Sequence, residues 1–507
     1  MKDLNNHLAQ LSLLQVLVVG AAREGCSLVR FFARIGAQVT LNDIKPAEAL
    51  MEALASLRNV PCQLALGQIL PELDGVDVLF ISPGVPPTAP VVQEARRRGL
   101  PISSEPRLLA QLCPAPIVGV TGSSGKTTTT TLIGEMQRAA GRNVWVGGNI
   151  GRPLLERVLD EAAPDIAVVE LSSFQLELFN PDYQGAETEM RRSPVSHAVY
   201  TGGWSPHVAT ILNITPNHLD RHPTMADYVW AKAQILRFQQ AGDWAVLNRD
   251  DPLSWELSQA DKGVVQGEIL AFSLQEQVPI GAFLRGETLT LRDGIRERPI
   301  CAMSEIKLRG WHNVANVLAA ACCAWASGLE IDPIREVATT FTGVPHRLEP
   351  VCRWRDVLYV NDSIATSPER AIAALHSFRE PLILLAGGRD KHLPWDDWAD
   401  LVLKRVRSVV AFGEAVPIIV RALEQAQARA GASVEQGPTL HTVASLEDAV
   451  ALAASLAQPG DVVLLSPGGT SFDAFRDFED RGRRFRELVV ALAAEDTQTK
   501  SVSSTSL

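Results

Sequence analysis

Short apolar runs alternate with amphipathic stretches along most of the chain. Near the N-terminus, the runs 16–20, 37–43 and 76–81 predict buried strands, and the segments between them have helical character. Such βαβ alternation predicts a parallel sheet whose loops at the carboxyl ends of the strands carry the ligand-binding groups. Asp43 ends the second run, and Ser82-Pro83-Gly84 follows the third.

The same alternation occurs twice more. The later predicted strands are 117–120, 166–170, 209–215, 357–360, 382–386, 408–412 and 462–466, and the predicted helices include 228–240 and 310–327. We therefore predict an α/β chain of three domains, residues 1–112, 113–343 and 344–507. The polar stretch 180–206 predicts a mobile surface insertion, and the Ser/Thr-rich tail from about 495 predicts disorder.

The net charge, the cysteines and the apolar runs of the chain argue against several classes of protein. The 507 residues carry a net charge of −11, which argues against a large nucleic-acid surface. Seven scattered cysteines without a C-x-x-C pair argue against a disulfide framework or a zinc site. We find neither a signal-peptide pattern nor an apolar run of membrane-spanning length, so we expect a cytoplasmic enzyme.

Residues 119–127, Gly-Val-Thr-Gly-Ser-Ser-Gly-Lys-Thr, are the strongest chemical signal. They lie between a predicted strand and a predicted helix, where backbone N–H groups can surround a phosphate. Lys126 would reach the β- and γ-phosphates of a nucleotide, and Thr127 would bind Mg²⁺. The generic motif has glycine six residues before the lysine, but position 120 is Val. A glycine turn without a ligand is the alternative.

The first turn, Gly20-Ala21-Ala22-Arg23-Glu24-Gly25, imitates the dinucleotide-binding pattern with Ala in the second glycine position. A redox dinucleotide site is therefore one interpretation. A nucleotide-sugar site on the same kind of turn fits the rest of the chain better.

Several polar residues of the central domain are candidates for nucleotide and metal chemistry. Glu170 and His218 follow predicted strands and are suitable Mg²⁺ ligands beside Thr127, although a helix-capping acid and a loop histidine are the alternatives. Lys232 shares a helix face with Tyr228, and a solvated lysine is the alternative. Asn313 and Asn316 share the face of an Ala-rich helix, where contacts to a nucleotide would offset the burial of two amides.

In the third domain, Asp362 follows a predicted strand and could orient a ribose or a cation. Thr366, Lys391 and Ser471 lie in loops that follow predicted strands and could bind a small dicarboxylate. Ordinary polarity of surface loops is the alternative for each of them.

Together these motifs resemble the Mur ligase family over about residues 15–492. The resemblance is carried by the phosphate loop 119–128 and by Gly-Gly-Asn-Ile-Gly (147–151), Glu-Leu-Ser-Ser-Phe-Gln-Leu-Glu (170–177), Asn-His-Leu-Asp-Arg-His-Pro (217–223), Pro-His-Arg (345–347), Asn-Asp-Ser-Ile-Ala-Thr (361–366) and Leu-Ser-Pro-Gly-Gly-Thr-Ser-Phe-Asp (465–473). Glycine at 119 rather than 120 is this family's form of the loop.

The resemblance implies a Rossmann-like first domain that binds a UDP-sugar, a P-loop ATPase-like central domain, and a Rossmann-like third domain that binds an amino acid. The segment 170–177 points to the branch that adds D-glutamate to UDP-N-acetylmuramoyl-L-alanine (UDP-MurNAc-L-Ala), through an acyl phosphate, in peptidoglycan synthesis. A related ligase that adds L-glutamate or another amino acid, such as a folylpolyglutamate synthase, is the nearer alternative. A nucleotide-sugar binder without catalysis is the further one.

By resemblance, Lys126, His218 and Lys232 are catalytic, and ATP is used with two Mg²⁺ ions. The implied ATP-binding residues are Gly122, Ser123, Ser124, Gly125, Lys126, Thr127, Thr128, Asn149, Asn313, Asn316, Arg347 and Asp362. The implied metal ligands are Thr127, Glu170, His218 and a carbamylated Lys232. The implied substrate contacts are Asp43, Ser82, Pro83, Gly84, Thr366, Lys391, Ser471 and Phe472, with Arg23 and Glu24 near the phosphates.

The chain departs from the family pattern in several places, of which three change charge or loop type. Ile364 replaces a lysine, Pro-Gly-Gly-Thr-Ser replaces a Pro-Ala-x-Ala-Ser type of loop, and Ala22-Arg23-Glu24 replaces a Gly-Leu-Thr-like turn. We expect a monomer that closes its third domain onto the second and binds no nucleic acid.

Overall fold

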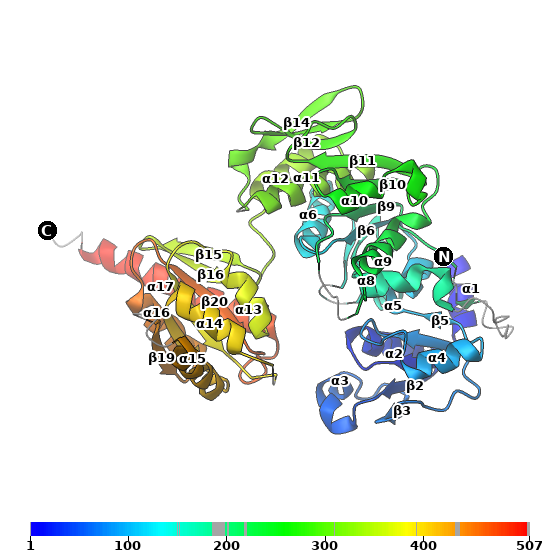
Figure 1. Ribbon diagram of the computed structural model, residues 1–507, viewed down its shortest axis with the longest axis horizontal. Helices are drawn as coiled ribbons and strands as arrows, with labels where there is room; N and C mark the ends of the chain where they lie inside the picture. The colour runs from blue at the N-terminus through cyan, green and yellow to red at the C-terminus, as the bar shows by residue number, and fades with distance from the viewer. Residues whose placement is uncertain are drawn as a thin grey trace. The chain divides into compact units, whose positions relative to one another are not determined.

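The computed structural model describes residues 2–149, 151, 153–184, 198–199, 202–216, 221–308, 310–391, 393–430 and 437–503, without the side chains of 2, 3, 52, 182, 184, 260 and 495–503. The chain forms two compact units, Met1–Phe341 and Thr342–Leu507 (Figure 1). The described residues form three sheets, and each of the three predicted domains contains one of them.

The first sheet has five parallel strands in the order β3-β2-β1-β4-β5. Its strands are β1 Gln15–Val19, β2 Gln38–Asp43, β3 Gln63–Leu66, β4 Val78–Ile81 and β5 Ile102–Ser103, and its helices are α1 Lys2–Leu11, α2 Arg23–Ile35, α3 Met51–Ala55, α4 Pro90–Arg97 and α5 Glu105–Leu112. Val16 and Val18 pack into the core that holds α2, whereas Leu17 and Val19 pack into the core that holds α4. Both faces are therefore buried, which explains the continuous apolar runs.

The second sheet has nine strands in the order β14-β13-β12-β11-β10-β9-β6-β8-β7. Its strands are β6 Ile117–Thr121, β7 Val144–Gly148, β8 Ile166–Glu170, β9 Val208–Ile211, β10 Trp244–Asn248, β11 Glu268–Ser273, β12 Gly281–Arg285, β13 Thr288–Arg292 and β14 Glu297–Ala302. Its helices are α6 Lys126–Ala139, α7 Arg157–Asp160, α8 Ser173–Leu176, α9 Met225–Arg237, α10 Pro252–Glu256, α11 Trp311–Ala326 and α12 Ile331–Thr340. Seven of the strands, β6 to β12, run parallel, and β13 and β14 add antiparallel pairs that the sequence pattern did not predict.

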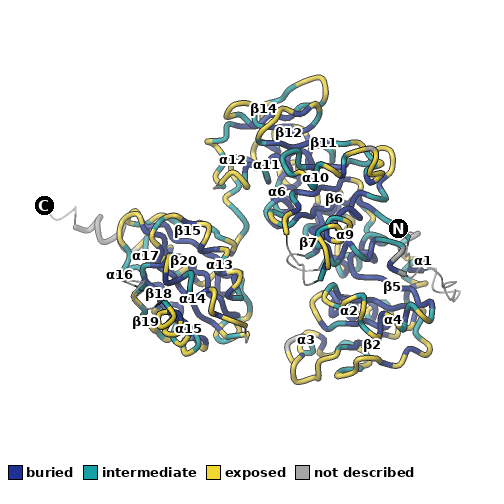
Figure 2. Tube along the Cα trace, in the orientation of Figure 1, coloured by how far each residue is buried: buried dark blue, intermediate teal, exposed yellow. Residues whose placement is uncertain are grey.

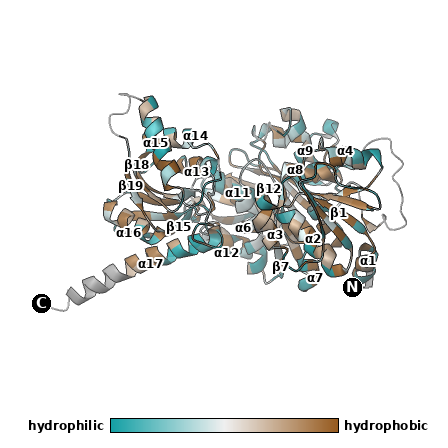
Figure 3. Cartoon of the chain, turned by 90° about the horizontal axis from the view of Figure 1, so that it is seen from below, coloured by the Kyte–Doolittle hydropathy of each residue, from teal (hydrophilic) through white to brown (hydrophobic). Residues whose placement is uncertain are grey.

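Alternate residues of β6 face opposite sides of the sheet and pack against different helices. Val118 and Val120 pack into the core formed with α6, α11 and α12, and Ile117 packs into the core formed with α8 and α9. In Figure 2 much of this sheet has the dark blue of buried residues, and Figure 3 colours the chain by hydropathy.

The C-terminal unit contains one six-stranded sheet in the order β15-β16-β20-β17-β18-β19. Its strands are β15 Glu349–Trp354, β16 Val357–Asn361, β17 Leu382–Gly387, β18 Val406–Phe412, β19 Thr439–Val443 and β20 Val462–Gly468, and its helices are α13 Pro368–Leu375, α14 Asp396–Arg405, α15 Val416–Ala430, α16 Leu446–Leu456 and α17 Phe478–Ser503. Only β15 pairs antiparallel within this sheet. Leu384 packs toward α13 and α14, and Leu385 packs toward α16 and α17.

The differences between the sequence predictions and the structure include the following three. The strand predicted over 209–215 ends at Ile211, because the following residues bond to the phosphate loop instead. Most of the predicted insertion 180–206 lies outside the described residues, but Tyr183, Ala198 and Val199 are buried. α17 carries a helical backbone to Ser503, where the sequence pattern predicted a disordered tail.

Within the described part of the chain, we find no helix with the length and apolar character needed to cross a membrane.

Candidate active site at the carboxyl ends of the central strands

The phosphate loop joins β6 to α6, as the sequence predicts. Gly125 caps α6 in a left-handed conformation, with φ of 80°. A Cβ atom at this position would approach Asn316 Oδ1 to 2.4 Å, so the loop also needs glycine because α11 lies close by. The Ser123 amide donates to the Asn213 carbonyl, and the Ser124 amide donates to Asn213 Oδ1. The segment after β9 therefore fixes the shape of the loop.

Gly119 has a packing role inside β6. A Cβ atom there would lie 2.6 Å from Pro206 Cγ and 3.1 Å from Ile235 Cδ1. The displaced glycine of the motif thus accommodates close packing on one face of the sheet.

Glu170 joins the loop that follows β7 to the phosphate loop. Its Oε2 accepts a hydrogen bond from Thr127 Oγ1 at 3.0 Å, and its Oε1 accepts one from Asn149 Nδ2 at 2.9 Å. Helix α8 is capped by Ser172, which forms a reciprocal capping box with Gln175. Glu170 is therefore not the helix-capping acid that the sequence left open.

The oxygens of Thr127 and Glu170 fit a magnesium ion. Two adjacent ligands of an octahedral Mg²⁺ at about 2.0–2.1 Å from the metal lie about 2.9 Å from each other. The observed Oγ1–Oε2 distance is 3.0 Å, and both side chains are buried. Among the described residues, groups of three or more His, Cys, Asp or Glu suited to a metal are absent. A metal site here would therefore need hydroxyl, water, phosphate or other ligands as well.

Lys232 lies deep in the part of the chain that forms the central sheet, so the alternative of a solvated lysine is wrong. Its side chain is on α9, and the residue is 1% exposed. Its Nζ lies 3.4 Å from Thr121 Oγ1 and 4.7 Å from the centre of the Tyr228 ring, so the shared face predicted for the two residues is confirmed. Burial lowers the pKa of Lys232 well below its usual value, Lys126 lowers it further, and Glu170 opposes the shift.

His218 lies outside the described residues, so its predicted role stays a prediction. Nearby in the sequence, His222 is 2% exposed, and its Nε2 lies 3.0 Å from Ser173 Oγ. Its Nδ1 lies 3.3 Å from Glu177 Oε1, and Arg221 forms an ion pair with the same carboxylate. The segment around 221–222 is thereby attached to the segment that follows β8.

The two amides of α11 share a face, as predicted. Asn316 Nδ2 donates to Asn313 Oδ1 at 3.1 Å, and Asn316 is buried against Gly125. Lys126, the first residue of α6, donates from Nζ to the Gly122 carbonyl at 2.8 Å. Its charge therefore lies at the concave side of the loop.

In the first sheet, the predicted UDP-sugar residues gather at the point where the strand order reverses. Ser82 Oγ donates to the Gly20 carbonyl at 2.8 Å, which joins the end of β4 to the end of β1. Asp43 Oδ2 accepts from the Ala21 amide at 2.8 Å, which adds the end of β2. Pro83 and Gly84 continue the same turn. Ligands of open α/β sheets bind in such a crevice.

In the C-terminal unit, Asp362 follows β16 and is 4% exposed. Its Oδ2 accepts from Ser466 Oγ at 2.9 Å, and its Oδ1 accepts from the Leu348 amide at 3.1 Å. Burial raises its pKa to about 7, against the hydrogen bond from Ser466 and the charge of Arg347. Asp362 and Arg347 therefore share one electrostatic environment.

Asp362 makes a testable contribution to stability. Because its pKa is about 7 in the folded chain and 3.8 as the reference value, the folded state holds its proton between these values. Its contribution to the free energy of unfolding is therefore largest at low pH and falls as the pH rises to about 7, by about 1.4 kcal/mol per pH unit. We expect the loss in free energy of unfolding caused by Asp362→Asn, relative to the parent chain, to be about 2 kcal/mol smaller at about pH 6.5 than at about pH 5. Denaturant unfolding at the two pH values measures this, and an equal cost at both would contradict it.

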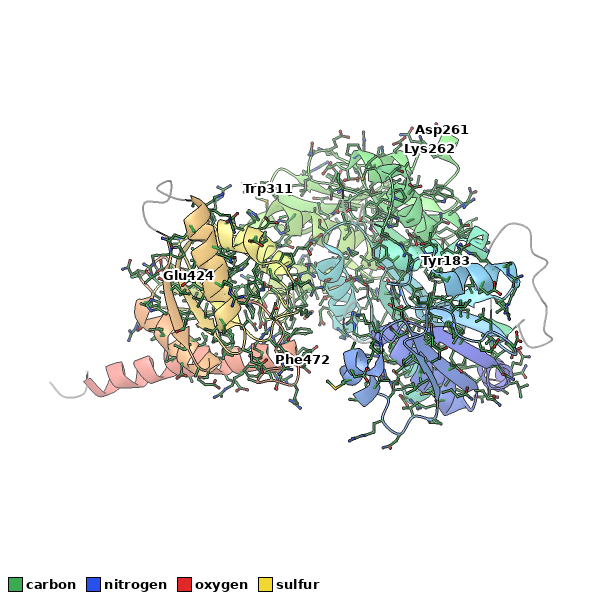
Figure 4. The ribbon with its side chains drawn as sticks, turned by 60° about the horizontal axis from the view of Figure 1, so that its bottom comes forward. Tyr183, Asp261, Lys262, Trp311, Glu424 and Phe472 are labelled. Atoms are coloured by element: carbon green, nitrogen blue, oxygen red, sulfur yellow. The ribbon has the colours of Figure 1, made fainter. Side chains whose placement is uncertain are left out.

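The predicted amino-acid residues are only partly brought together. Lys391 Nζ lies 3.4 Å from Thr366 Oγ1. Ser471 is buried beside the turn where Arg389 and Thr470 exchange backbone hydrogen bonds. Phe472, labelled in Figure 4, is 41% exposed.

Arg481 was not identified from the sequence, and the structure shows that it is fully buried. Its guanidinium donates to the Gly469 and Thr470 carbonyls and to both oxygens of Ser363. It thus joins the turn before Ser471 to the loop after β16. One arginine in the arginine-rich stretch 476–486 gave no sequence signal that it would be buried.

Three family models match the chain. They are the Mur ligase MurD-like N-terminal domain over residues 14–104, the Mur ligase middle domain over 120–324, and the Mur ligase glutamate ligase domain over 346–469. The UDP-N-acetylmuramoylalanine--D-glutamate ligase of Symbiobacterium thermophilum is 44% identical over 482 residues, which are 94% of this chain and 98% of the relative. The enzyme of the same name from Acetivibrio thermocellus is 39% identical over 481 residues, 95% of this chain and 97% of the relative.

Solved structures are similar to this chain at the level of the fold. MurF of Acinetobacter baumannii has a TM-score of 0.52 at 18% identity, covering 95% of this chain and 98% of its own. UDP-N-acetylmuramate-alanine ligase of Thermotoga maritima has a TM-score of 0.51 at 18% identity, covering 94% and 99%. Because the family models cover more than half of the chain, and the relatives above 30% identity match it almost from end to end, the chain belongs to the Mur ligase family.

Proposed function

We propose that this protein is an ATP-dependent ligase that joins D-glutamate to UDP-MurNAc-L-Ala in peptidoglycan synthesis. The names of the relatives that match it over nearly its whole length support this substrate pair. The observation that carries the chemistry is the pairing of Thr127 with Glu170 beside a phosphate loop and a buried lysine.

The part of the chain that forms the central sheet and its helices would hold the nucleotide and its metal. The amides of 122–125 and the Lys126 ammonium would surround the phosphates, with Thr128 in the first turn of the helix. Thr127 and Glu170 would hold one Mg²⁺. Asn313 and Asn316 face the loop from α11 and would contact the nucleotide. Bound Mg²⁺ would neutralise charge on the transferring phosphoryl group.

A second Mg²⁺ would be held by His218 and by a carbamate on Lys232. A neutral amine is the form that reacts with CO₂, and the lowered pKa of Lys232 favours that form. The buried position of this amine supports the proposal.

In the proposed reaction, the alanyl carboxylate attacks the γ-phosphoryl group, and an acyl phosphate and ADP result. The amine of D-glutamate then attacks the acyl carbon, loses a proton, and displaces inorganic phosphate. Phosphate is a far better leaving group than hydroxide, which is why the carboxylate is activated first. Asn149 lies beside Glu170 and would orient the reacting carboxylate.

The remaining predicted residues would bind the other parts of the substrates. Asp43, Ser82, Pro83 and Gly84 would bind the UDP group in the crevice of the first sheet. Arg347 and Asp362 would contact the phosphate and ribose of ATP. Lys391, Thr366, Ser471 and Phe472 would receive the amino acid, with Lys391 as the cation for a carboxylate. The monomeric state and the cytoplasmic location stay predictions.

A panel of amino acids tests the proposed function. With ATP, Mg²⁺ and UDP-MurNAc-L-Ala present, we expect D-glutamate to support phosphate release at least about a hundredfold faster than L-glutamate, because a polar site that pairs with one stereoisomer leaves the misplaced carboxylate of the other without its partner. Reactions without the UDP-sugar are the control. Preference for L-glutamate would favour the related superfamily ligases, and no phosphate release with any amino acid would refute the ligase proposal.

A further inference from the structure

The first residue of α2, Arg23, contacts the loop that follows β7 in the central sheet. Its Nη1 donates to the Gly151 carbonyl at 2.7 Å, and its Nη2 reaches the Asn149 carbonyl at 3.2 Å. A single guanidinium therefore spans two carbonyl oxygens of one loop, which its rigid fork allows. The turn of the first sheet is thus attached directly to the loop of the central sheet.

The neighbouring residue, Glu24, contacts the short helix α8, which follows β8 in the central sheet. Its Oε1 accepts from Gln175 Nε2 at 2.6 Å, and Gln175 also forms the capping box of α8 with Ser172. The start of α2 therefore contacts both the loop after β7 and the short helix after β8.

Glu170 lies between these two contacts. The Asn149 amide donates to the Glu170 carbonyl at 2.9 Å, while its side chain donates to Oε1. The other carboxylate oxygen accepts from Thr127. Continuous hydrogen bonds thus run from Arg23 through Asn149 and Glu170 to the phosphate loop.

We propose that Arg23 is a positioning residue of the ligase: by holding the carbonyls of Asn149 and Gly151, it orients Asn149 and, through it, the Glu170 carboxylate toward the metal-binding position. This inference rests on the proposed function. It gives a role to an arginine in the turn Ala22-Arg23-Glu24, which replaces the Gly-Leu-Thr-like turn of the family.

The rest of α2 is held independently. Arg30 forms a two-pronged ion pair with Glu156, and Arg34 pairs with Asp160. Both partners belong to the central part of the chain beyond the loop after β7. Loss of Arg23 should therefore leave the helix in place and affect only that loop.

The test compares Arg23→Ala with Arg34→Ala, which removes another arginine contact between the same helix and the central part of the chain without touching the loop. We expect Arg23→Ala to lower kcat about tenfold, the usual effect of removing a group that orients a metal ligand, and to weaken Mg²⁺ binding in calorimetry with ATP present. KM for UDP-MurNAc-L-Ala should stay within about twofold, and Arg23→Lys should recover part of kcat because lysine can still donate to one carbonyl. Arg34→Ala should change neither kcat nor Mg²⁺ binding.

Hydrogen exchange supplies a readout that does not depend on turnover. The Asn149 amide, bonded to the Glu170 carbonyl, should exchange faster in Arg23→Ala and at the parent rate in Arg34→Ala. A raised KM for the UDP-sugar with unchanged kcat would overturn the proposal, because Arg23 would then be a substrate ligand. Equal losses in both variants would also overturn it, as a general weakening of the interface. An inactive parent enzyme would refute the proposed function, whereas an active parent insensitive to Arg23→Ala would refute only this inference.

Discussion

Replacing Lys126 by alanine is expected to reduce ATP-dependent phosphate release on the order of a thousandfold. The Lys126 ammonium lies 2.8 Å from the Gly122 carbonyl and 3.3 Å from the Ser123 carbonyl, at the concave side of the phosphate loop. It is the side chain of this loop that can place a full positive charge on the β- and γ-phosphates. Its removal should weaken stabilisation of the transferring group more than it weakens ATP binding, since backbone amides of the loop remain.

The measurement is release of ADP and phosphate at saturating ATP, UDP-MurNAc-L-Ala and D-glutamate. Arg138→Ala is the matched control, because Arg138 lies in the last turn of the same helix and pairs with Glu135 at the surface. We expect that control to keep the parent rate within about twofold. An undiminished rate of ADP release in Lys126→Ala would contradict the assigned role.

Some strands of this chain follow from the sequence, but β7, β10, β11 and β12 of the central sheet were not predicted although most of their residues are buried. The run 166–170 is predicted and observed with the same limits, because a fully apolar run ends at a charged residue. The antiparallel strands β13 and β14 at one end of the sheet were also missed, since they mix half-buried with buried positions.

The environment of single side chains was harder to predict than their position. Lys232 occurs in an ordinary helical pattern, and its burial comes from β6 and from the phosphate loop, more than a hundred residues earlier in the chain. Arg481 is buried for the same kind of reason, because its carbonyl partners come from loops after β16 and β20. Periodicity shows which face of an element is apolar, but it does not show which distant polar group meets an individual residue.

Resemblance to a family identified most of the candidate residues, but it did not show their contacts. Gln175 belongs to the segment 170–177, yet its partner Glu24 lies in the divergent turn of the first sheet. The hydrogen bond between Thr127 and Glu170 likewise joins residues from two strand ends. The resemblance implied that these groups act together, and the structure shows the distances between them.

Replacing Lys232 by methionine is expected to lower the ligase rate on the order of a thousandfold, because it removes the amine that would carry the carbamate while keeping the apolar stem of the side chain. The buried amine lies next to Thr121 and above the Tyr228 ring. Burial disfavours its charged form, so the uncharged amine that reacts with CO₂ is populated at a lower pH than for an exposed lysine. A carbamate would supply the anionic oxygen that Mg²⁺ prefers, close to Glu170.

Dependence on dissolved CO₂ distinguishes this role from simple packing. We expect the parent enzyme to lose activity in CO₂-depleted buffer and to recover it when bicarbonate is added, with slower recovery at lower pH because the amine is then protonated. Lys232→Met should not respond to bicarbonate. The exposed Lys262, which pairs with Glu256, provides the control Lys262→Met, which should behave as the parent in both buffers. Near-normal activity of Lys232→Met would show that the amine is dispensable, and a parent enzyme indifferent to CO₂ would show that the amine acts without modification.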